Sequence, residues 1–222
     1  MKISTALILF FFFHLSVFGE NKHVLFIGSS TMERWTTLAA DFPSVQVTNL
    51  GMGGTQYPYL VEHAKAWAKS YPADEIVIYS GDNDIAENVD PKTIAENFQK
   101  TVSILHAQLP HAHITVISIK PSPDRWPKAK EIRAANKEIA EVASHFDFVS
   151  ILNIFPKMLT ATGEPQKELF LPDGVHMNQM GYEIWKNALA NHWAEESLKS
   201  KIPSGLAAIT YTVKPICEPP AL

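Results

Sequence analysis

Short apolar runs alternate with stretches of helical periodicity along most of this chain. The runs are rich in Val, Ile and Phe, and several are apolar at consecutive positions, which is typical of strands buried on both faces of a parallel sheet. The expected strands are Val24–Ile27, Val45–Val47, Ile76–Tyr79, Ile114–Ile119 and Phe148–Leu152. This alternation of strands and helices predicts a three-layer, doubly wound α/β fold.

The intervening segments place apolar side chains three or four residues apart, as one face of a helix does. The stripes run from Leu60 to Tyr71, from Ile94 to Leu109, from Ile132 to Phe146 and from Tyr182 to Trp193. Asp90 is placed as the N-cap of the second helix, with Pro91 at its first position. The last helix is expected from Gln179 to about Leu198, capped by Asn178. The Met and aromatic residues of these stripes are interpreted as core.

The length of 222 residues fits one domain of ordinary size, or at most two small ones, and suffices to bury a core. Lys and Arg number 19 against 23 Asp and Glu, and no basic run occurs. This balance argues against an electrostatic nucleic-acid binder. Cys217 is the single cysteine of the sequence, so an intrachain disulfide or a cysteine-based zinc site is excluded.

Residues 1–19 have the pattern of a secretory signal peptide. Lys2 supplies a positive start, Ala6–Phe18 is nearly all apolar, and Val17-Phe18-Gly19 places small residues where cleavage occurs. The apolar run is short for a membrane span, and an uncleaved anchor is the alternative. We therefore expect an exported protein, periplasmic or extracellular, with one domain at 20–199. Residues 200–222 contain four prolines and are expected to be a C-terminal tail.

A polar cluster follows each of the expected strands. In open parallel sheets, ligands bind beyond the carboxyl ends of the strands, so these clusters should meet at one edge. The clusters contain Ser29-Ser30-Thr31, Gly51–Thr55, Asp82-Asn83-Asp84, Lys120–Trp126 and, beyond the fifth strand, Asp173–His176.

The residue types in these clusters suit acyl transfer to a serine nucleophile. A serine hydroxyl needs a base, and the spacing of Asp173 and His176 lets the carboxylate hold one imidazole nitrogen while the other faces Ser30. Gly54 offers an unshielded backbone N–H, and Asn83 a side-chain amide, for the oxyanion of a tetrahedral intermediate. Taken singly, Ser30 could be a helix cap, Asn83 a turn residue and His176 a surface residue. Their occurrence together and in order favours the catalytic interpretation.

In these blocks the chain resembles the SGNH/GDSL hydrolases, a superfamily of serine esterases and lipases. The likeness extends from about Val24 to Trp193 and rests on the blocks Phe26–Ser30, Asn49–Gly54, Gly81–Asp84 and Asp173–His176. The resemblance implies a flavodoxin-like fold with five parallel strands and a triad of Ser30, Asp173 and His176, which needs no cofactor or metal. It also implies an oxyanion hole formed by Gly54, Asn83 and the backbone N–H of Ser30. The Asp that usually precedes the serine in this family is Ser29 here.

The expected substrate is a soluble ester with a short acyl group, such as an acetyl group on a carbohydrate. The loops at the active edge lack the run of large apolar residues that a lid or an acyl tunnel needs. They carry instead groups that suit a sugar face, namely Asp82, Asp84, Asp124, Arg125 and Trp126. Arg125 and Trp126 are the candidate substrate-binding residues. The alternatives are a lysophospholipase or lipase-type esterase, an acyltransferase using the same serine, and a carbohydrate-binding protein on an inactive esterase fold.

His111-x-His113 could place two imidazoles on one face of a strand, as a metal pair does. No third ligand is evident nearby in the sequence. The pair is therefore interpreted as part of a solvated loop that leads into the fourth strand. The sequence does not define the oligomeric state.

Overall fold

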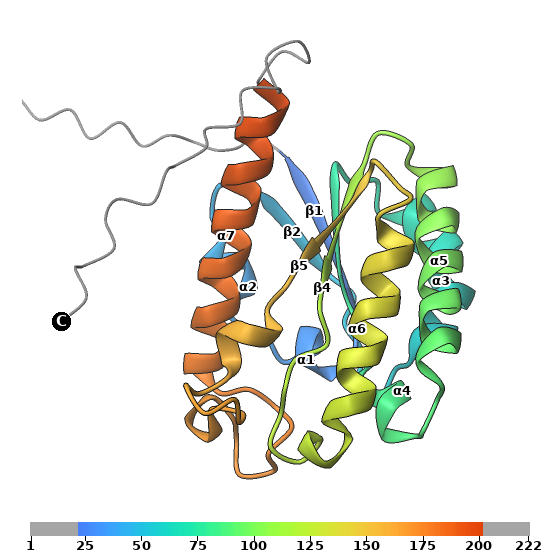
Figure 1. Cartoon of the computed structure of the whole chain (residues 1–222). Coiled ribbons are helices and arrows are strands. Elements are labelled where there is room, and N and C mark those ends of the chain that lie inside the picture. The colour runs from blue at the N-terminus through green and yellow to red at the C-terminus, as the bar shows by residue number, and fades with distance from the viewer. Residues whose placement is uncertain (1–21, 202–222) are drawn as a thin grey trace, which may run out of the picture.

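The computed structural model describes residues 22–201. Five parallel strands form one sheet in the order β2-β1-β3-β4-β5, which confirms the predicted fold class (Figure 1). The strands are β1 (His23–Gly28), β2 (Gln46–Asn49), β3 (Glu75–Tyr79), β4 (His113–Ile117) and β5 (Val149–Leu152). In this flavodoxin-like order the chain reverses its direction across the sheet between β1 and β3, so the carboxyl ends of these two strands border a crevice.

Helices cover both faces of the sheet. Figure 1 shows α3 (Tyr57–Ser70), α5 (Pro91–Gln108) and α6 (Ala129–Ala143) on one face and α7 (Gln179–Lys201) on the other. The shorter helices are α1 (Ser30–Glu33), α2 (Leu38–Asp41) and α4 (Asp82–Ala86), and the 3₁₀ turns are η1 (Trp126–Lys128), η2 (Phe155–Met158) and η3 (Lys167–Leu169).

Successive residues of β1 enter two separate cores. Leu25 and Ile27 belong to the core beneath α3, α5 and α6, whereas Val24 and Phe26 belong to the core beneath α7. All four side chains are fully buried. A strand covered on both faces must be apolar at every position, which explains the unbroken apolar run in the sequence.

Aromatic residues fill the core beneath α7. The Trp35 ring lies 6.1 Å from the Trp185 ring, edge to face, and 5.4 Å from the Tyr182 ring, measured between centroids. Trp193 contacts Phe42 at a centroid distance of 5.1 Å. The three tryptophans are buried, so the interpretation as core is confirmed for the stripe of α7. It is wrong for Tyr71, which is 38% exposed at the end of α3.

The expected starts of the two longest helices agree with the structure. The Asp90 carboxylate accepts a hydrogen bond from the backbone N–H of Lys92 at 2.9 Å, and Pro91 is the first helical residue. The Asn178 side chain accepts a hydrogen bond from the N–H of Met180 at 2.9 Å. The far end of α7 differs, because the helix continues to Lys201 and passes the expected end near Leu198.

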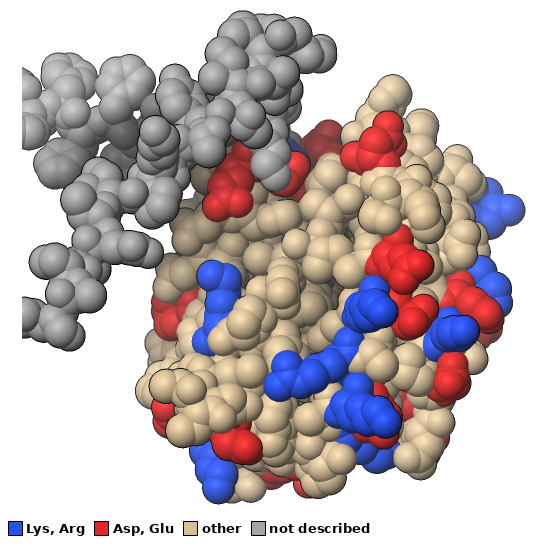
Figure 2. Space-filling view, viewed as in Figure 1, with Lys and Arg blue, Asp and Glu red and all other residues tan. Residues whose placement is uncertain are grey.

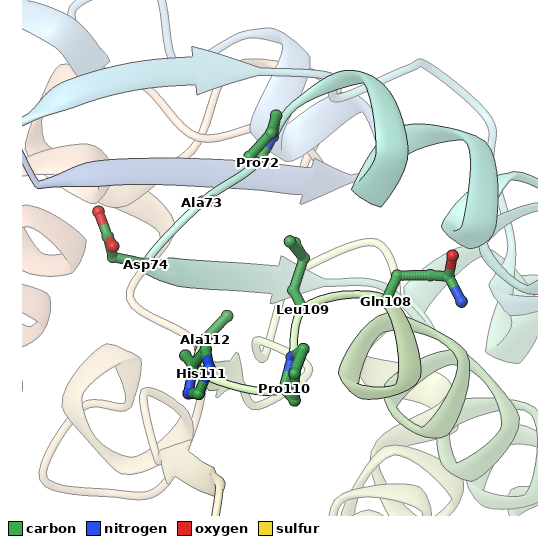
Figure 3. Close-up of a pocket in the computed structure, with 8 residues that line it drawn as sticks. All are labelled: Pro72, Ala73, Asp74, Gln108, Leu109, Pro110, His111 and Ala112. Carbon is green, nitrogen blue, oxygen red and sulfur yellow. The ribbon is translucent and has the colours of Figure 1, made fainter.

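The amino ends of β3 and β4 border a pocket of about 350 Å³ (Figure 3). Its lining residues come from the connections leading into these strands and from Gln108 at the end of α5. His111 lines this pocket and is exposed, whereas His113 begins β4 and its Nε2 lies 2.8 Å from Ser150 Oγ. The two imidazoles therefore have different surroundings. Within residues 22–201, no three His, Cys, Asp or Glu side chains form a group that could hold a metal ion.

Basic and acidic side chains lie next to one another on the face that α5 and α6 cover (Figure 2). In the part of the chain that the structure describes, no helix combines the length and the apolar character needed to cross a membrane. The predicted signal peptide at 1–19, Cys217 and all but the first two residues of the predicted tail lie outside the described residues.

Candidate active site

A sharp turn after β1 brings Ser30 to the carboxyl edge of the sheet. Gly28 has a φ of +149°, and a Cβ on it would lie 2.0 Å from the carbonyl oxygen of Tyr79, so only glycine fits here. Ser29 follows in extended conformation as the N-cap of α1, and Ser30 is the first helical residue. Ser29 and Thr31 are buried, whereas Ser30 is partly exposed. The turn thus presents one hydroxyl group of this cluster at the surface.

Three side chains form a continuous chain of hydrogen bonds at this edge. Ser30 Oγ lies 3.0 Å from His176 Nε2, and His176 Nδ1 lies 2.7 Å from Asp173 Oδ2. Ser30 and His176 are 146 positions apart in the sequence. The fold therefore brings together the three residues to which the sequence analysis gave the roles of nucleophile, base and orienting carboxylate.

Asp173 is held within its own turn. Its Oδ1 accepts hydrogen bonds from the backbone N–H groups of Val175 and His176, both at 2.9 Å. Burial alone would raise the pKa of Asp173, but the hydrogen bonds from the His176 ring and these two N–H groups outweigh burial and hold the pKa well below its usual range. An ionised carboxylate at Nδ1 favours the tautomer in which Nε2 can accept a proton from Ser30.

Backbone hydrogen bonds also close the loop that carries Asp173 and His176. The N–H of Leu171 donates to the carbonyl oxygen of His176 at 2.8 Å, and Phe170 pairs with Met177 in an antiparallel bridge. These contacts join the two ends of the loop. His176 is therefore presented by a constrained loop rather than by a free segment.

The loop after β2 lies over α1. A Cβ on Gly53 would lie 3.9 Å from Ser30 Cβ, and Thr55 Oγ1 donates to the carbonyl oxygen of Gly28 at 3.1 Å. Gly54 has a φ of +76° and open space where a side chain would begin. The backbone N–H groups of Gly54 and Ser30 have no acceptor among residues 22–201. Two backbone donors are thus available to an oxyanion here.

Asn83 supplies a third donor. One hydrogen of its side-chain amide is donated to the carbonyl oxygen of Thr55 at 2.8 Å, which fixes the amide orientation and leaves the second N–H for another acceptor. Gln56 Nε2 donates to the carbonyl oxygen of Asn83 at 3.4 Å. These contacts tie the start of α4 to the loop that contains Gly54.

The prediction that two carboxylates, Asp82 and Asp84, contact a sugar substrate is wrong. Asp82 and Asp84 are only 4% and 0% exposed, so neither can line a substrate cleft. Asp82 Oδ2 instead accepts a hydrogen bond from Lys120 Nζ at 2.8 Å, and both oxygens of Asp84 accept from the N–H of Tyr57, at 3.2 and 3.3 Å. The buried position of Lys120 has no signal in the sequence, because a lysine after a strand normally indicates a solvated loop.

The loop of Arg125 and Trp126 lies beside the Asp–His loop, since the N–H of Asp124 donates to the carbonyl oxygen of Gly174 at 3.0 Å. Arg125 forms an ion pair with Asp124. Trp126 lines a pocket of about 460 Å³ together with Pro123, Pro127, Glu164, Pro165 and Lys167. No sequence signal identified Glu164 or Lys167, because they come from an irregular segment far from any motif.

The sequence model of the GDSL-like Lipase/Acylhydrolase family matches residues 27–184. The chain belongs to this family. The acylhydrolase is therefore a hydrolase of ester bonds, and the predicted family and enzyme class are confirmed. No curated protein matches the acylhydrolase by sequence.

Solved structures share its fold over most of both chains. A Streptococcus pneumoniae protein described as a platelet activating factor has 25% identity and a TM-score of 0.69, covering 81% of the acylhydrolase and 86% of that protein. A GDSL-like lipase from Bacteroides thetaiotaomicron has 20% identity and a TM-score of 0.67, covering 79% and 89%. A family 3 carbohydrate esterase from Clostridium thermocellum has 14% identity and a TM-score of 0.66, covering 81% and 98%.

Ser29 stands where the resemblance to the family leads one to expect Asp. Its side chain is fully buried, and its hydroxyl has no hydrogen-bond partner among the described residues. The turn that precedes Ser30 is therefore formed without a carboxylate at this position, and the backbone of Gly28 and Ser29 defines the turn.

Proposed function

We propose that this acylhydrolase is an exported serine esterase that removes short, acetyl-type acyl groups from a carbohydrate or another soluble ester. The observation that carries the proposal is the chain of hydrogen bonds from Ser30 through His176 to Asp173. Export is inferred from the signal-peptide pattern of residues 1–19. The N-terminal sequence of protein recovered from the periplasm or the medium should begin after Gly19, and an intact N-terminus would contradict cleavage.

The proposed reaction proceeds through an acyl-enzyme. His176 Nε2 takes the proton of Ser30 as Oγ attacks the ester carbonyl, and Asp173 stabilises the imidazolium that forms. The oxyanion accepts hydrogen bonds from the N–H groups of Ser30 and Gly54 and from the Asn83 amide. The imidazolium then protonates the ester oxygen as its bond to the carbonyl carbon breaks, so the alcohol leaves and the acyl group stays on Ser30 Oγ. Water attacks the acyl carbon while His176 takes its proton. The bond to Ser30 Oγ then breaks, the acid leaves, and His176 returns the proton to Oγ.

A short acyl group is favoured by the side chains around the site. Two large hydrophobic residues of the active-edge loops are exposed, Met52 at 46% and Leu171 at 38%. Two isolated side chains can contact a methyl group, but they do not enclose a long chain. Each CH₂ of a longer acyl group contributes about 0.8 kcal/mol only where an apolar wall buries it. The structural neighbours include an acetyl esterase and two carbohydrate esterases, which supports the proposal at the level of the fold.

The pocket that contains Trp126 is the proposed site for the alcohol part of a carbohydrate ester. An indole face packs against the C–H groups of a sugar ring, and Glu164 and Lys167 supply an acceptor and donors for hydroxyl groups. Because Asp124 contacts Gly174 of the Asp–His loop, this pocket adjoins the loop of the proposed base.

A series of p-nitrophenyl esters from acetyl to dodecanoyl tests the acyl preference. The value of kcat/KM should be highest for acetyl or propionyl and should fall by octanoyl, since the longer chains find no enclosing wall. Ser30→Ala should leave a folded protein that has lost at least about 10³-fold of the activity. A maximum at octanoyl or beyond would favour a lysophospholipase or lipase-type substrate, and an active Ser30→Ala variant would exclude the mechanism.

The leaving-group pocket has its own test. Trp126→Ala should raise KM for an acetylated xylo-oligosaccharide and leave hydrolysis of p-nitrophenyl acetate nearly unchanged, because only the first substrate carries a sugar. Tyr71→Ala, at the C-terminal end of α3, is the matched control for loss of a partly exposed aromatic ring. Equal effects of the two variants on the oligosaccharide would contradict the assignment of the pocket.

A further inference from the structure

Lys120 is a fully buried lysine at the carboxyl end of β4. Its side chain has no exposed surface, and Nζ contacts Asp82 Oδ2 at 2.8 Å, the Tyr79 hydroxyl at 3.0 Å and Thr31 Oγ1 at 3.2 Å. The ammonium group has three hydrogens, and each has an acceptor in this arrangement. Lysine is almost never buried in this way unless it is paired.

Two of these partners adjoin proposed catalytic groups. Thr31 follows Ser30 in α1, and Asp82 precedes Asn83 in α4. The two helices follow the neighbouring strands β1 and β3, which are paired up to Gly28 and Tyr79. Contacts made after the strands end add to this register in setting the relative position of the helices. A single ammonium group thus contacts both the segment of the nucleophile and the segment of an oxyanion donor.

A gain in folding stability does not explain why this ion pair is buried. Burying two charges costs about as much as their attraction returns, and well-packed apolar residues often replace such pairs without loss. Asp82 Oδ1 has no hydrogen-bond partner among the described residues, which adds to the cost. Burial alone would raise the pKa of Asp82, yet the charge and hydrogen bond of Lys120, aided by Tyr79 and Arg125, lower it. The carboxylate is therefore ionised and firmly paired.

Further contacts fix the position of Lys120. The side-chain amide of Asn136 pairs with both backbone groups of the preceding residue, Ile119, at 2.7 Å to the N–H and 2.9 Å to the carbonyl. The ammonium group lies 5.1 Å from the centre of the Tyr79 ring, and this ring packs against Trp185 at 4.8 Å. The position of Nζ is thus defined by α6, β3 and α7 together.

We propose that Lys120 and Asp82 form a positioning ion pair, which sets the separation between Ser30 and the Asn83 amide during the reaction. The inference rests on the proposed function, because it assumes that Ser30 is the nucleophile and that the Asn83 amide donates to the oxyanion. A displacement of about 1 Å between reacting groups can lower a rate by about 10²-fold. Lys120 acts through its neighbours and does not touch the substrate.

The first test removes only the contact with α1. Thr31→Val deletes the hydroxyl that Lys120 contacts and keeps the shape of the side chain. Thr115→Val is the matched control, because Thr115 is also buried and its Oγ1 donates to a buried charged group, Glu75 Oε1, at 2.6 Å near the opposite end of the sheet. Both variants should lower the melting temperature to a similar degree. Only Thr31→Val should lower kcat for p-nitrophenyl acetate, by roughly fivefold or more, with KM within about twofold of wild type.

A second test removes the ion pair without leaving one charge buried alone. The double variant Lys120→Met with Asp82→Leu should fold, since apolar residues replace buried pairs well. Its kcat should fall at least about tenfold at nearly unchanged KM, because the oxyanion donor is no longer held in register with the nucleophile. The single variant Lys120→Arg keeps the charge, so its kcat should lie between the kcat of the double variant and that of wild type.

Ser30→Ala separates failure of this inference from failure of the proposed function. If Ser30→Ala is inactive while Thr31→Val and the double variant keep a kcat within twofold of wild type, the positioning role is overturned and the mechanism stands. A Thr115→Val variant with the same loss of kcat as Thr31→Val would also overturn it, since a general loss of rigidity would then explain both. If the double variant does not fold, the comparison of Thr31→Val with Thr115→Val decides alone. An active Ser30→Ala variant would overturn both proposals.

Discussion

Asp84 carries a carboxyl group that the fold keeps from solvent. The residue is 0% exposed, and its two oxygens share the backbone N–H of Tyr57. Burial raises the pKa of Asp84 from 3.8 to about 6, the Tyr57 hydrogen bonds partly oppose this rise, and the nearby charge of Asp82 adds to it. Folding therefore favours the protonated form of this group.

The sign of the pH dependence follows from this difference. The folded protein binds the proton of Asp84 more tightly than the unfolded chain does. The stabilising contribution is fully present below about pH 4 and is lost as the pH rises through about 6. The rise in pKa from 3.8 to about 6 corresponds to about 3 kcal/mol at roughly 1.4 kcal/mol per pH unit. About 2 kcal/mol of this change should fall between pH 4.5 and pH 7.5.

Asp84→Asn isolates this contribution, because the amide is neutral at every pH and its oxygen can still accept from Tyr57. The free energy of unfolding, measured by urea denaturation at several pH values, should shift in favour of the variant by about 2 kcal/mol between pH 4.5 and pH 7.5. Asp90→Asn, which alters an exposed carboxyl at the N-cap of α5, is the control and should show no comparable trend. A difference between Asp84→Asn and wild type that stays constant with pH would refute the reasoning.

Further predictions concern the site and the turn that builds it. Asn83→Ala should lower kcat by about 10²–10³ with little change in KM, and a pure KM effect would make Asn83 a substrate-positioning residue. Asp173→Asn should lower kcat by roughly 10³–10⁴ through the wrong tautomer of His176, while circular dichroism remains native. Gly28→Ala should destabilise the fold by more than about 4 kcal/mol in urea denaturation, because a Cβ would clash with the Tyr79 carbonyl. Treatment with EDTA should leave the esterase rate unchanged, since the proposed triad uses no metal; strict metal dependence would renew interest in His111 and His113.

The parts of the fold with strong local chemistry were predictable from the sequence. Asp90 and Pro91 define the start of α5 because a cap and a fixed φ act within one turn. The meeting of Ser30, Asp173 and His176 was also predictable. Parallel strands expose their carboxyl ends at one edge, which is where the cluster of Ser30 was expected. Asp173 and His176 follow β5 only after η2 and η3, and the resemblance of their block to the family's pattern identified them.

The ends of elements that lack a strong local pattern could not be predicted accurately from the sequence. The strand expected at Val45–Val47 is β2 at Gln46–Asn49. This edge strand is exposed at both ends and partly buried in the middle, so its apolar run does not mark its ends. The helices α1, α2 and α4 are too short to show a helical period. Phe146 continues an apolar stripe beyond α6 but lies in the turn after it, since an apolar residue can pack from a turn as well as from a helix.

The inward orientation of Asp82 could not be read from its own position. A carboxylate after a strand is normally solvated, and Asp82 is buried only because Lys120 reaches it from the end of the neighbouring β4, 38 positions later. Such a pair depends on tertiary contact alone and leaves no periodic trace. The pocket around Trp126 also leaves no periodic trace in the sequence, because Glu164 comes from a distant irregular segment.

The separation of Ser30 and His176 by 146 positions has a consequence for when the enzyme becomes active. During synthesis, α1, which begins with Ser30, and α4, which contains Asn83, emerge long before the Asp–His loop. A chain that has reached β5 contains Ser30, the proposed nucleophile, but not yet His176, and a serine hydroxyl without a base is a weak nucleophile. Contacts of such high sequence separation form late in folding, after the entropy of closing the intervening loop has been overcome. Esterase activity should therefore appear in one step with the docking of the Asp–His loop, so that recovery of activity reports completion of the native fold.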